Sequence, residues 1–339
     1  MRAMLPSRMA GLVDVVRALR RARRVGLRTR TYADARFNTQ TPHTVVPVTT
    51  PDGVALRVHA YGPESADVIV FAHGWSCCIE YWNPQINAFS EDYRVVAYDQ
   101  RGHGESELGN RPLSADLLAD DLSAVLDAVL RPGQRAVLVG HSMGGITIQA
   151  WAGRSGGRRV AERAAAVVLT NTAPGDLIAE TTLIPLLRRL PVPLLKPIGR
   201  VVVSSPAPCP PLAPVRWVFR HRVMTPATTG DAADFAFAIV RACSPWVRAR
   251  FGVLLAGLDL GRAAAELTVP TTVIAGSDDD LTPVVHAERI AEMLTEVGAL
   301  ERLTVLPTGH LGNVEAVEAF NAALSGVLTS AFTAREATA

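Results

Sequence analysis

The most constraining feature of this sequence is a serine flanked by glycines where a predicted strand meets a predicted helix. Residues 136–139 are a continuous apolar run, and residues 143–154 have helical periodicity. Between them lies Gly140-His-Ser-Met-Gly144, a G-x-S-x-G pattern. Glycine permits a turn too tight for a Cβ atom, and such a turn lifts a serine hydroxyl above the carboxyl edge of a sheet. The pattern predicts that Ser142 is a nucleophile; a plain Gly/Ser turn is the alternative.

The rest of the chain alternates between strand-like and helix-like patterns from residue 45 onward. This alternation predicts an α/β fold with a mostly parallel central sheet and helices on both faces. Ser114 and Asn313 are predicted helix N-caps. The turn signal Pro51-Asp-Gly53 predicts an antiparallel hairpin between residues 45–49 and 54–60. Further strands are expected at residues 68–72, 94–98, 136–139, 166–170, 271–275 and 302–306, and helices at residues 114–130, 143–154, 283–294 and 313–328.

A proline-rich segment interrupts this alternation. Eleven of the 23 prolines lie between Pro174 and Pro226, and residues 206–211 can form neither a helix nor a central strand. We interpret residues 174–265 as an insertion that covers the sheet edge as a cap or lid. The expected domains are a helical basic extension (1–40), the first part of the core (41–173), the cap (174–265), the second part of the core (266–332) and a flexible tail (333–339).

The first 36 residues are strongly basic, with ten arginines against two aspartates in a chain of net charge +2. A basic amphipathic helix over residues 9–25 is expected to pack on the domain or to form a frayed tail, and contact with an anionic membrane surface is the alternative. No apolar run long enough for a signal peptide or a membrane span is present. We therefore expect a cytoplasmic protein, at most peripheral to the membrane. Tyr32 is the one aromatic residue among these arginines and no nucleic-acid-binding motif is present, so no nucleic-acid partner is expected.

A serine needs a base and an acid to become a nucleophile. His310 follows the last predicted strand and is the candidate base. Three adjacent carboxylates, Asp278, Asp279 and Asp280, follow the preceding strand. The histidine and the aspartates are all expected at the same sheet edge as Ser142. Along the chain they give the order serine, acid, histidine that this architecture requires.

A loop whose backbone amides are candidates for binding an oxyanion follows the strand predicted at residues 68–72. His73-Gly74-Trp75 leaves that strand. The backbone amides of Trp75 and Met143 are predicted to form an oxyanion hole; a plain strand exit is the alternative. We expect five residues to border the substrate: His73, Gly74, Trp82, His141 and Leu281.

Taken with Tyr98-Asp-Gln-Arg-Gly-His-Gly-Glu-Ser106, these motifs resemble the α/β-hydrolase fold of the esterase/lipase, monoacylglycerol-lipase-like and haloperoxidase-like group. The resemblance implies that Asp279 is the acid of the triad, with Asp278 and Asp280 as rivals. It also implies that Asp99, Arg101, Gly102 and His103 shape a structural turn in which His103 is not catalytic, and that residues 174–265 are the cap.

The expected activity is hydrolysis of a carboxylic ester with a hydrophobic acyl group, through an acyl-enzyme and without a cofactor or metal. The four cysteines lack the paired spacing of a zinc site. The same triad would serve a perhydrolase, acyltransferase, thioesterase, lactonase or amidase. Ser142 argues against epoxide hydrolases and haloalkane dehalogenases, which carry aspartate at this position. A non-enzymatic protein that binds a hydrophobic ligand or a partner is the other alternative.

Overall fold

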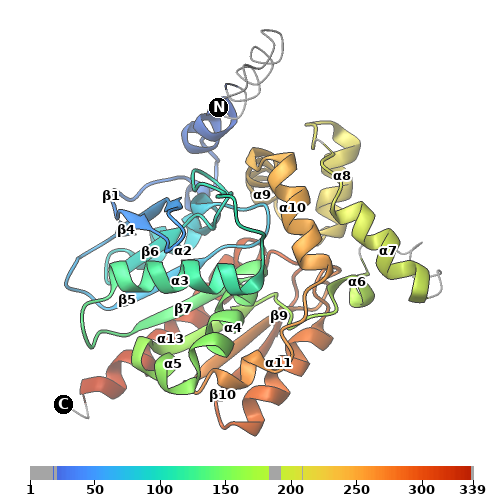
Figure 1. Ribbon diagram of the computed structural model, residues 1–339. Coiled ribbons are helices and arrows are strands. Elements are labelled where there is room, and N and C mark those ends of the chain that lie inside the picture. The colour runs from blue at the N-terminus through green and yellow to red at the C-terminus, as the bar shows by residue number, and fades with distance from the viewer. Residues whose placement is uncertain (1–17, 19–20, 183–191, 208, 337–339) are drawn as a thin grey trace, which may run out of the picture.

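The computed structural model describes residues 18, 21–182, 192–207 and 209–336 (Figure 1). Most of the helix predicted over residues 9–25 lies outside this range. Residues 21–29 are helical, and their one buried apolar side chain, Leu27, belongs to the core on one face of the sheet. None of the described helices combines the length and apolar character that crossing a bilayer requires.

One eight-stranded sheet forms the centre of the described residues. From β6 to β10 its strands run parallel, while β4 pairs antiparallel with β6 and β1 pairs antiparallel with β4. This confirms the mostly parallel sheet expected from the sequence. In sheet order the strands are β1 (His43–Val45), β4 (Val58–Tyr61), β6 (Arg94–Tyr98), β5 (Val68–Ala72), β7 (Ala136–His141), β8 (Ala164–Thr170), β9 (Thr271–Gly276) and β10 (Leu300–Leu306).

The predicted hairpin is present beside this sheet. β2 (Val48–Thr49) pairs antiparallel with β3 (Ala55–Leu56). The turn between them is closed by a hydrogen bond from the Thr50 amide to the Val54 carbonyl, 2.9 Å long. Gly53 lies in this turn with a φ of 79°, a conformation that glycine adopts without a steric cost.

Helices cover both faces of the sheet because the side chains of each strand alternate between two cores (Figure 1). In β5, Val68 and Val70 face one core, whereas Ile69 and Phe71 face the other. The first core is closed by α3 (Ala115–Val129), α4 (Met143–Ser155), α5 (Gly157–Arg163) and α11 (Val284–Glu296). The second core is closed by α2 (Asn83–Phe89), α9 (Gly230–Ala242) and α13 (Val317–Glu336).

The two predicted N-caps have different outcomes. The Ser114 hydroxyl accepts a hydrogen bond of 3.1 Å from the Leu117 amide and caps α3, as expected. The prediction for Asn313 is wrong, because Asn313 lies inside a short helix, α12 (Gly312–Glu315). Its side chain instead accepts a 2.6 Å hydrogen bond from the Tyr81 hydroxyl. The last helix, α13, continues to Glu336, so residues 333–336 of the predicted tail are helical.

The described residues between β8 and β9 are mostly helical. Residues 205–207 and 209–212 contain neither helix nor strand, as their prolines require. The helices of this segment are α6 (Leu177–Glu180), α7 (Val192–Val203), α8 (Ala213–Arg222), α9 and α10 (Pro245–Ala256), followed by the 3-10 helix η4 (Ala263–Glu266). Two further 3-10 helices lie earlier in the chain, η1 (Ala35–Phe37) and η2 (Ile79–Trp82).

The contact between α4 and β5 gives a testable prediction. Replacing Gly144 by alanine should destabilise the fold by about 1–3 kcal/mol, because the new Cβ would lie 2.0 Å from the carbonyl oxygen of Ala72. Gly326→Ala is the matched control, since nothing lies within 4 Å of the added Cβ in α13. Urea unfolding of both variants measures the difference. An unchanged free energy of unfolding for Gly144→Ala would contradict this close approach.

Candidate active site

Ser142 occupies a strained turn between β7 and α4. Its φ of 52° and ψ of −116° are unusual for a residue with a side chain. The Ser142 amide donates a 3.0 Å hydrogen bond to the Thr170 carbonyl at the end of β8. A Cβ on Gly140 would lie 2.7 Å from the Gly144 carbonyl, so only glycine allows the chain to turn this tightly. The strand–turn–helix predicted around this serine is confirmed.

Three side chains from three sheet-edge loops form a continuous hydrogen-bonded chain. The Ser142 hydroxyl donates to Nε2 of His310 over 2.9 Å. Nδ1 of the same ring donates to the Asp279 carboxylate, 2.9 Å from Oδ2 and 3.1 Å from Oδ1. His310 follows β10 and Asp279 follows β9, so the parallel sheet brings residues that are distant in sequence to one edge. Such a chain can deprotonate a serine and stabilise the imidazolium that results.

The Asp279 carboxylate is buried and surrounded by donors. Oδ1 accepts from the amides of Leu281 and Thr282, at 2.9 and 2.8 Å. Oδ2 accepts from the Thr282 hydroxyl at 2.6 Å and from the Asn171 amide group at 3.0 Å. Burial raises the pKa of this carboxyl, but His310 and these hydrogen bonds outweigh it and lower the pKa to about 2. Asp279 is therefore ionised at neutral pH.

The two rival carboxylates lie elsewhere. Asp278 is exposed and accepts a hydrogen bond from the Ser277 hydroxyl. Asp280 forms an ion pair with Arg222 at 3.2 Å and accepts from the Thr181 hydroxyl through its backbone carbonyl. Among the three adjacent carboxylates, Asp279 is thus the one hydrogen-bonded to His310.

The predicted oxyanion loop lies beside the serine because of strand register. Ala72 of β5 pairs with Gly140 of β7, so the residues that follow each strand leave the sheet side by side. A Cβ on Gly74 would lie 3.2 Å from the Ser142 Cβ. The Trp75 indole donates a 3.0 Å hydrogen bond to the Arg248 carbonyl in α10 and anchors this loop. Met143 is the first residue of α4, where amides have no partner within the helix.

An apolar cavity of about 260 Å³ opens above the serine. Ser142 and His310 lie in its wall, together with Trp75 from the loop after β5. The segment between β8 and β9 supplies much of the remaining lining: Leu177 and Ile178 from α6, Gly199 and Val203 from α7, Phe219 from α8, Val223 just after it, Val240 from α9, and Arg248, Gly252, Leu255 and Ala256 from α10. Such a lining suits an apolar group bound next to the serine.

The five residues expected to border substrate divide between this cavity and the core. His141 and Leu281 line the cavity, and Gly74 packs against the His141 ring. His73 is buried instead, where its Nε2 accepts a 3.0 Å hydrogen bond from the Gln100 amide. Trp82 is also fully buried. Its ring stacks on Phe71, with ring centroids 4.6 Å apart. The structure therefore corrects the expectation for His73 and Trp82, which support the loop from beneath.

Two residues that the sequence analysis missed hold the acid and the histidine loop. Asn171 follows β8 in the left-handed region, with φ of 47°. Its amide group donates to Asp279 and also to the Gly309 carbonyl at 3.1 Å. The Thr282 hydroxyl lies 3.2 Å from Nδ1 of His310 as well as bonding Asp279. A polar residue directly after a buried strand was the available signal for Asn171.

Glu315 in α12 connects the histidine loop to the inserted segment. Its Oε1 accepts from the Leu311 amide at 3.1 Å. Its Oε2 accepts from the Thr225 amide and the Thr228 hydroxyl, at 2.8 and 2.9 Å. The His310 amide also donates directly to the Val223 carbonyl, over 2.8 Å. The position of the imidazole is thus tied to the segment between α8 and α9.

A second polar cluster lies beneath the loop after β5. Cys78, Glu80 and Asp99 place three metal-ligating atoms within 4.8 Å of one another. The Arg57 guanidinium pairs with both carboxylates, at 2.8 Å from Glu80 and 3.1 Å from Asp99. Arg28 also pairs with Glu80, so two guanidinium groups already offset the two carboxylates, and the cluster fits a structural ion-pair network better than a metal site. Asp99 also accepts a 2.7 Å hydrogen bond from the Ile79 amide, which holds the loop.

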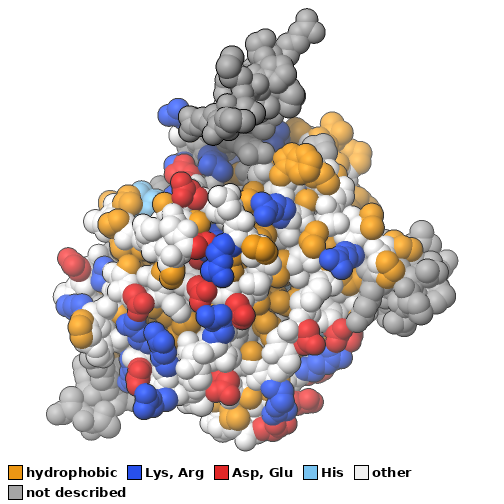
Figure 2. All heavy atoms as spheres, viewed as in Figure 1, with side chains coloured by type: hydrophobic (Ala, Val, Ile, Leu, Met, Phe, Trp, Pro, Cys, Tyr) orange, Lys and Arg blue, Asp and Glu red, His pale blue; other side chains and the backbone are white. Residues whose placement is uncertain are grey.

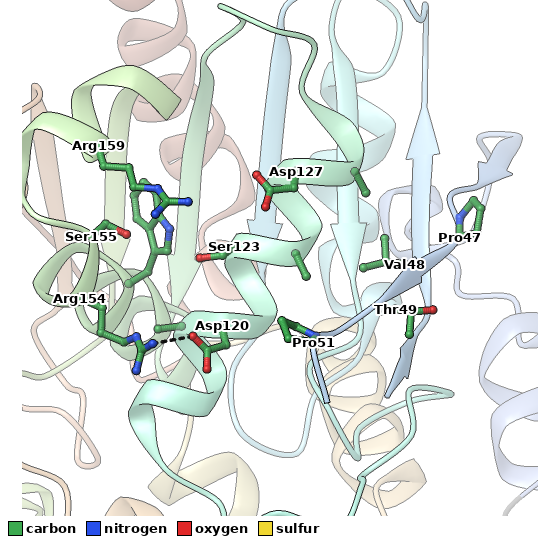
Figure 3. Close-up of a pocket in the computed structure, with 14 residues that line it drawn as sticks. Pro47, Val48, Thr49, Pro51, Asp120, Ser123, Asp127, Arg154, Ser155 and Arg159 are labelled. Atoms are coloured by element: carbon green, nitrogen blue, oxygen red, sulfur yellow. Dashed lines mark ion pairs between the residues drawn. The ribbon is translucent and has the colours of Figure 1, made fainter. Parts of the chain in front are cut away.

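A second hollow of about 670 Å³ lies between β2, α3 and α4 (Figure 3). Asp120 and Asp127 project into it from α3, opposite Arg154 and Arg159 (Figure 3). Arg154 and Asp120 form an ion pair at 2.9 Å. None of its lining residues also lines the cavity above Ser142, and its charges largely balance.

A parallel sheet with helices on both faces and a serine turn at its carboxyl edge is the architecture of the α/β hydrolases. A profile of the alpha/beta hydrolase family matches residues 69–323, and the chain belongs to this family. It is 28% identical to 3-oxoadipate enol-lactonase 2 of Acinetobacter baylyi over 284 residues, covering 82% of this chain and 95% of that protein.

Further comparisons extend the range of relatives. Identity to the non-heme chloroperoxidase of Burkholderia pyrrocinia is 29% over 272 residues, covering 75% of this chain and 89% of that protein. A thermophilic esterase from Thermogutta terrifontis shares the fold, with a TM-score of 0.67, 21% identity and coverage of 85% and 99%. The proteins similar to this chain thus include esterases and haloperoxidases, as the resemblance read from the sequence implied, and also lactonases.

The hydrogen bonds of Asp279 predict that its substitution lowers kcat far more than substitution of the adjacent aspartates. Asp279→Asn should lower kcat by about 10⁴-fold, because the amide no longer holds the histidine in its reactive tautomer. Asp278→Asn and Asp280→Asn are matched controls that make the same change one residue away, and they should keep kcat within about tenfold. Steady-state kinetics on a soluble ester measure all three. Equal losses in the three variants would contradict the assignment.

The bonds of Glu315 predict a positioning role. Glu315→Ala leaves three donors without their acceptor, and we expect kcat to fall about 10- to 100-fold with a smaller change in KM. Glu315→Gln keeps an acceptor oxygen and should recover part of the loss. Glu318→Ala is the control, because this side chain is 80% exposed. The rate of fluorophosphonate labelling at Ser142 provides a second readout. Labelling as fast in Glu315→Ala as in Glu318→Ala would exclude this role.

Proposed function

We propose that this protein is a serine hydrolase that cleaves carboxylic esters of hydrophobic acyl groups. The observation that carries the proposal is the hydrogen-bonded chain from Ser142 through His310 to Asp279, with the serine in the wall of an apolar cavity. Each of these three side chains lies within hydrogen-bond distance of the partner that acyl transfer requires.

In the proposed reaction, Ser142 Oγ attacks the acyl carbonyl while His310 Nε2 accepts its proton. The amides of Trp75 and Met143 stabilise the oxyanion of the tetrahedral intermediate. His310 then protonates the departing alcohol, and the acyl group remains on the serine. A water molecule, deprotonated by the same imidazole, attacks the acyl-enzyme and releases the acid. Throughout, the ionised Asp279 keeps Nδ1 protonated and stabilises the positive charge on the ring.

The inserted segment, residues 174–265, is proposed to act as the cap that selects the acyl group. Its helices supply apolar side chains such as Val203, Phe219 and Leu255 to the cavity. Burying an acyl chain among them gains about 0.8 kcal/mol for each methylene removed from water. Binding should therefore strengthen with chain length until the cavity is filled, which favours medium or longer chains over acetyl.

Other acceptors or leaving groups would use the same residues. A lactone is an ester whose leaving alcohol stays attached, and one relative is named an enol-lactonase. Peroxide in place of water would give a peracid, and one relative is named a bifunctional esterase/perhydrolase. Both activities would use Ser142 as the nucleophile. They are therefore tested by assaying the same variants with lactones as substrates and with esters in the presence of added peroxide.

The direct test is hydrolysis of p-nitrophenyl esters from acetate to palmitate, with Ser142→Ala beside the wild type. We expect kcat/KM to rise with acyl length and then fall, and the variant to lose at least about 10³-fold. Thr147→Ser, a change of one buried hydroxyl residue in α4, controls for disturbance of this helix. Turnover that survives in Ser142→Ala would refute the proposal.

Labelling with a fluorophosphonate probe distinguishes the remaining outcomes. Labelling at Ser142 without ester turnover would place the activity on an amide, a lactone or another acyl acceptor. A folded protein with neither labelling nor turnover would support the alternative that the site only binds a hydrophobic ligand or a partner.

A further inference from the structure

The helices between β8 and β9 carry most of the exposed apolar side chains. Eleven large hydrophobic residues are exposed in the described residues, and seven of them lie between residues 198 and 253. We call six of these the outer apolar face: Val201, Leu212, Trp217, Val218, Trp246 and Val253. Trp217 and Trp246 are the largest members, with 60% and 66% of their surface exposed.

These helices are apolar on two sides. In α8, Phe219 lines the cavity, whereas the neighbouring Trp217 faces outward. In α10, Leu255 lines the cavity and Trp246 faces outward. A surface helix of a water-soluble protein normally has one apolar stripe, directed at the core. A second group of apolar side chains on the exposed side is typical of a surface that contacts something apolar.

The outer apolar face spans several elements of this segment. α7 and α10 pack against each other, as do α8 and α9. The loop that joins α7 to α8 is fastened to the same helices, because Arg241 donates a 3.2 Å hydrogen bond to the Cys209 carbonyl and Arg248 donates to the Ala207 carbonyl. Figure 2 shows hydrophobic side chains gathered over α7, α8 and α10, with basic side chains among them.

The charge of this region is positive. Residues 192–256 contain eight basic and two acidic residues, although the whole chain has a net charge of only +2. Residues 21–30 add five arginines and no acidic residue. The two basic segments are neighbours, since Arg30 and Arg216 both form ion pairs with Asp234 in α9. The surface around the exposed tryptophans thus complements a negatively charged, partly apolar partner.

We propose that the outer apolar face docks on a lipid bilayer that contains anionic phospholipids. Trp217 and Trp246 would lie in the interfacial layer, where amphipathic aromatic rings are favoured. Exposed arginines such as Arg250 would contact the headgroup phosphates. A second copy of this chain fits the surface less well, because association of two such faces would bring two basic surfaces together. The cavity above Ser142 lies on the inner side of the same helices.

Sedimentation of the full chain with vesicles tests the proposal. Pure phosphatidylcholine vesicles are compared with vesicles that contain about 30 mol% phosphatidylglycerol. We expect binding to the anionic vesicles, weakened by added salt. The double variant Trp217→Ser/Trp246→Ser should bind at least about tenfold more weakly. Arg250→Glu should also weaken binding, and Ser142→Ala should bind like the wild type, which separates docking from catalysis.

Control variants make apolar-to-serine and arginine-to-glutamate changes elsewhere on the surface. Val45→Ser/Val305→Ser alters two exposed residues outside the outer apolar face, and Arg158→Glu alters an exposed arginine in α5. Thermal unfolding shows that each variant is folded. Failure of the wild type to bind anionic vesicles would overturn the proposal. Equal binding by the tryptophan variant and its control would overturn it too, and so would a dimer in solution that dissociates only in the tryptophan variant.

Discussion

The pairing of β7 between β5 and β8 is the constraint on which the rest of the candidate site depends. Its register aligns Ala72 with Gly140 and His141 with Thr170, so three strands end together at one edge. A shift of one residue would turn every side chain of β7 to the opposite core. The alternation of apolar residues between two buried faces therefore fixes where Ser142 leaves the sheet.

Burial of charge is the second constraint, and donors from several elements satisfy it. Asp279 keeps its charge inside the protein because two amides, Thr282, Asn171 and His310 all donate to it. Without them desolvation would favour the protonated form. Arg57 plays the corresponding part beneath the loop after β5, where it pairs with two buried carboxylates. Both networks lie directly under loops whose backbone geometry the proposed chemistry uses.

The inserted helices link three properties of the molecule. Their inner sides line the cavity, their outer sides carry exposed tryptophans and arginines, and the segment after α8 bonds to the histidine loop through Val223 and Glu315. A change in the position of these helices would therefore reach the imidazole through a short series of hydrogen bonds. This is a physical route between a surface contact and the serine.

The sequence by itself determined the sheet, most helices and the serine turn, because local patterns dictate these features, and it predicted His310 as the base from its place after the last strand. Strand periodicity, a capping serine and paired glycines act over a few residues. Local patterns could not separate the three adjacent aspartates, since all three follow the same strand; the family resemblance pointed to Asp279, and the tertiary structure shows Asp279 hydrogen-bonded to His310. It also placed His73 and Trp82 in the core and Asn313 in a polar pair, because burial depends on neighbours far away in the chain.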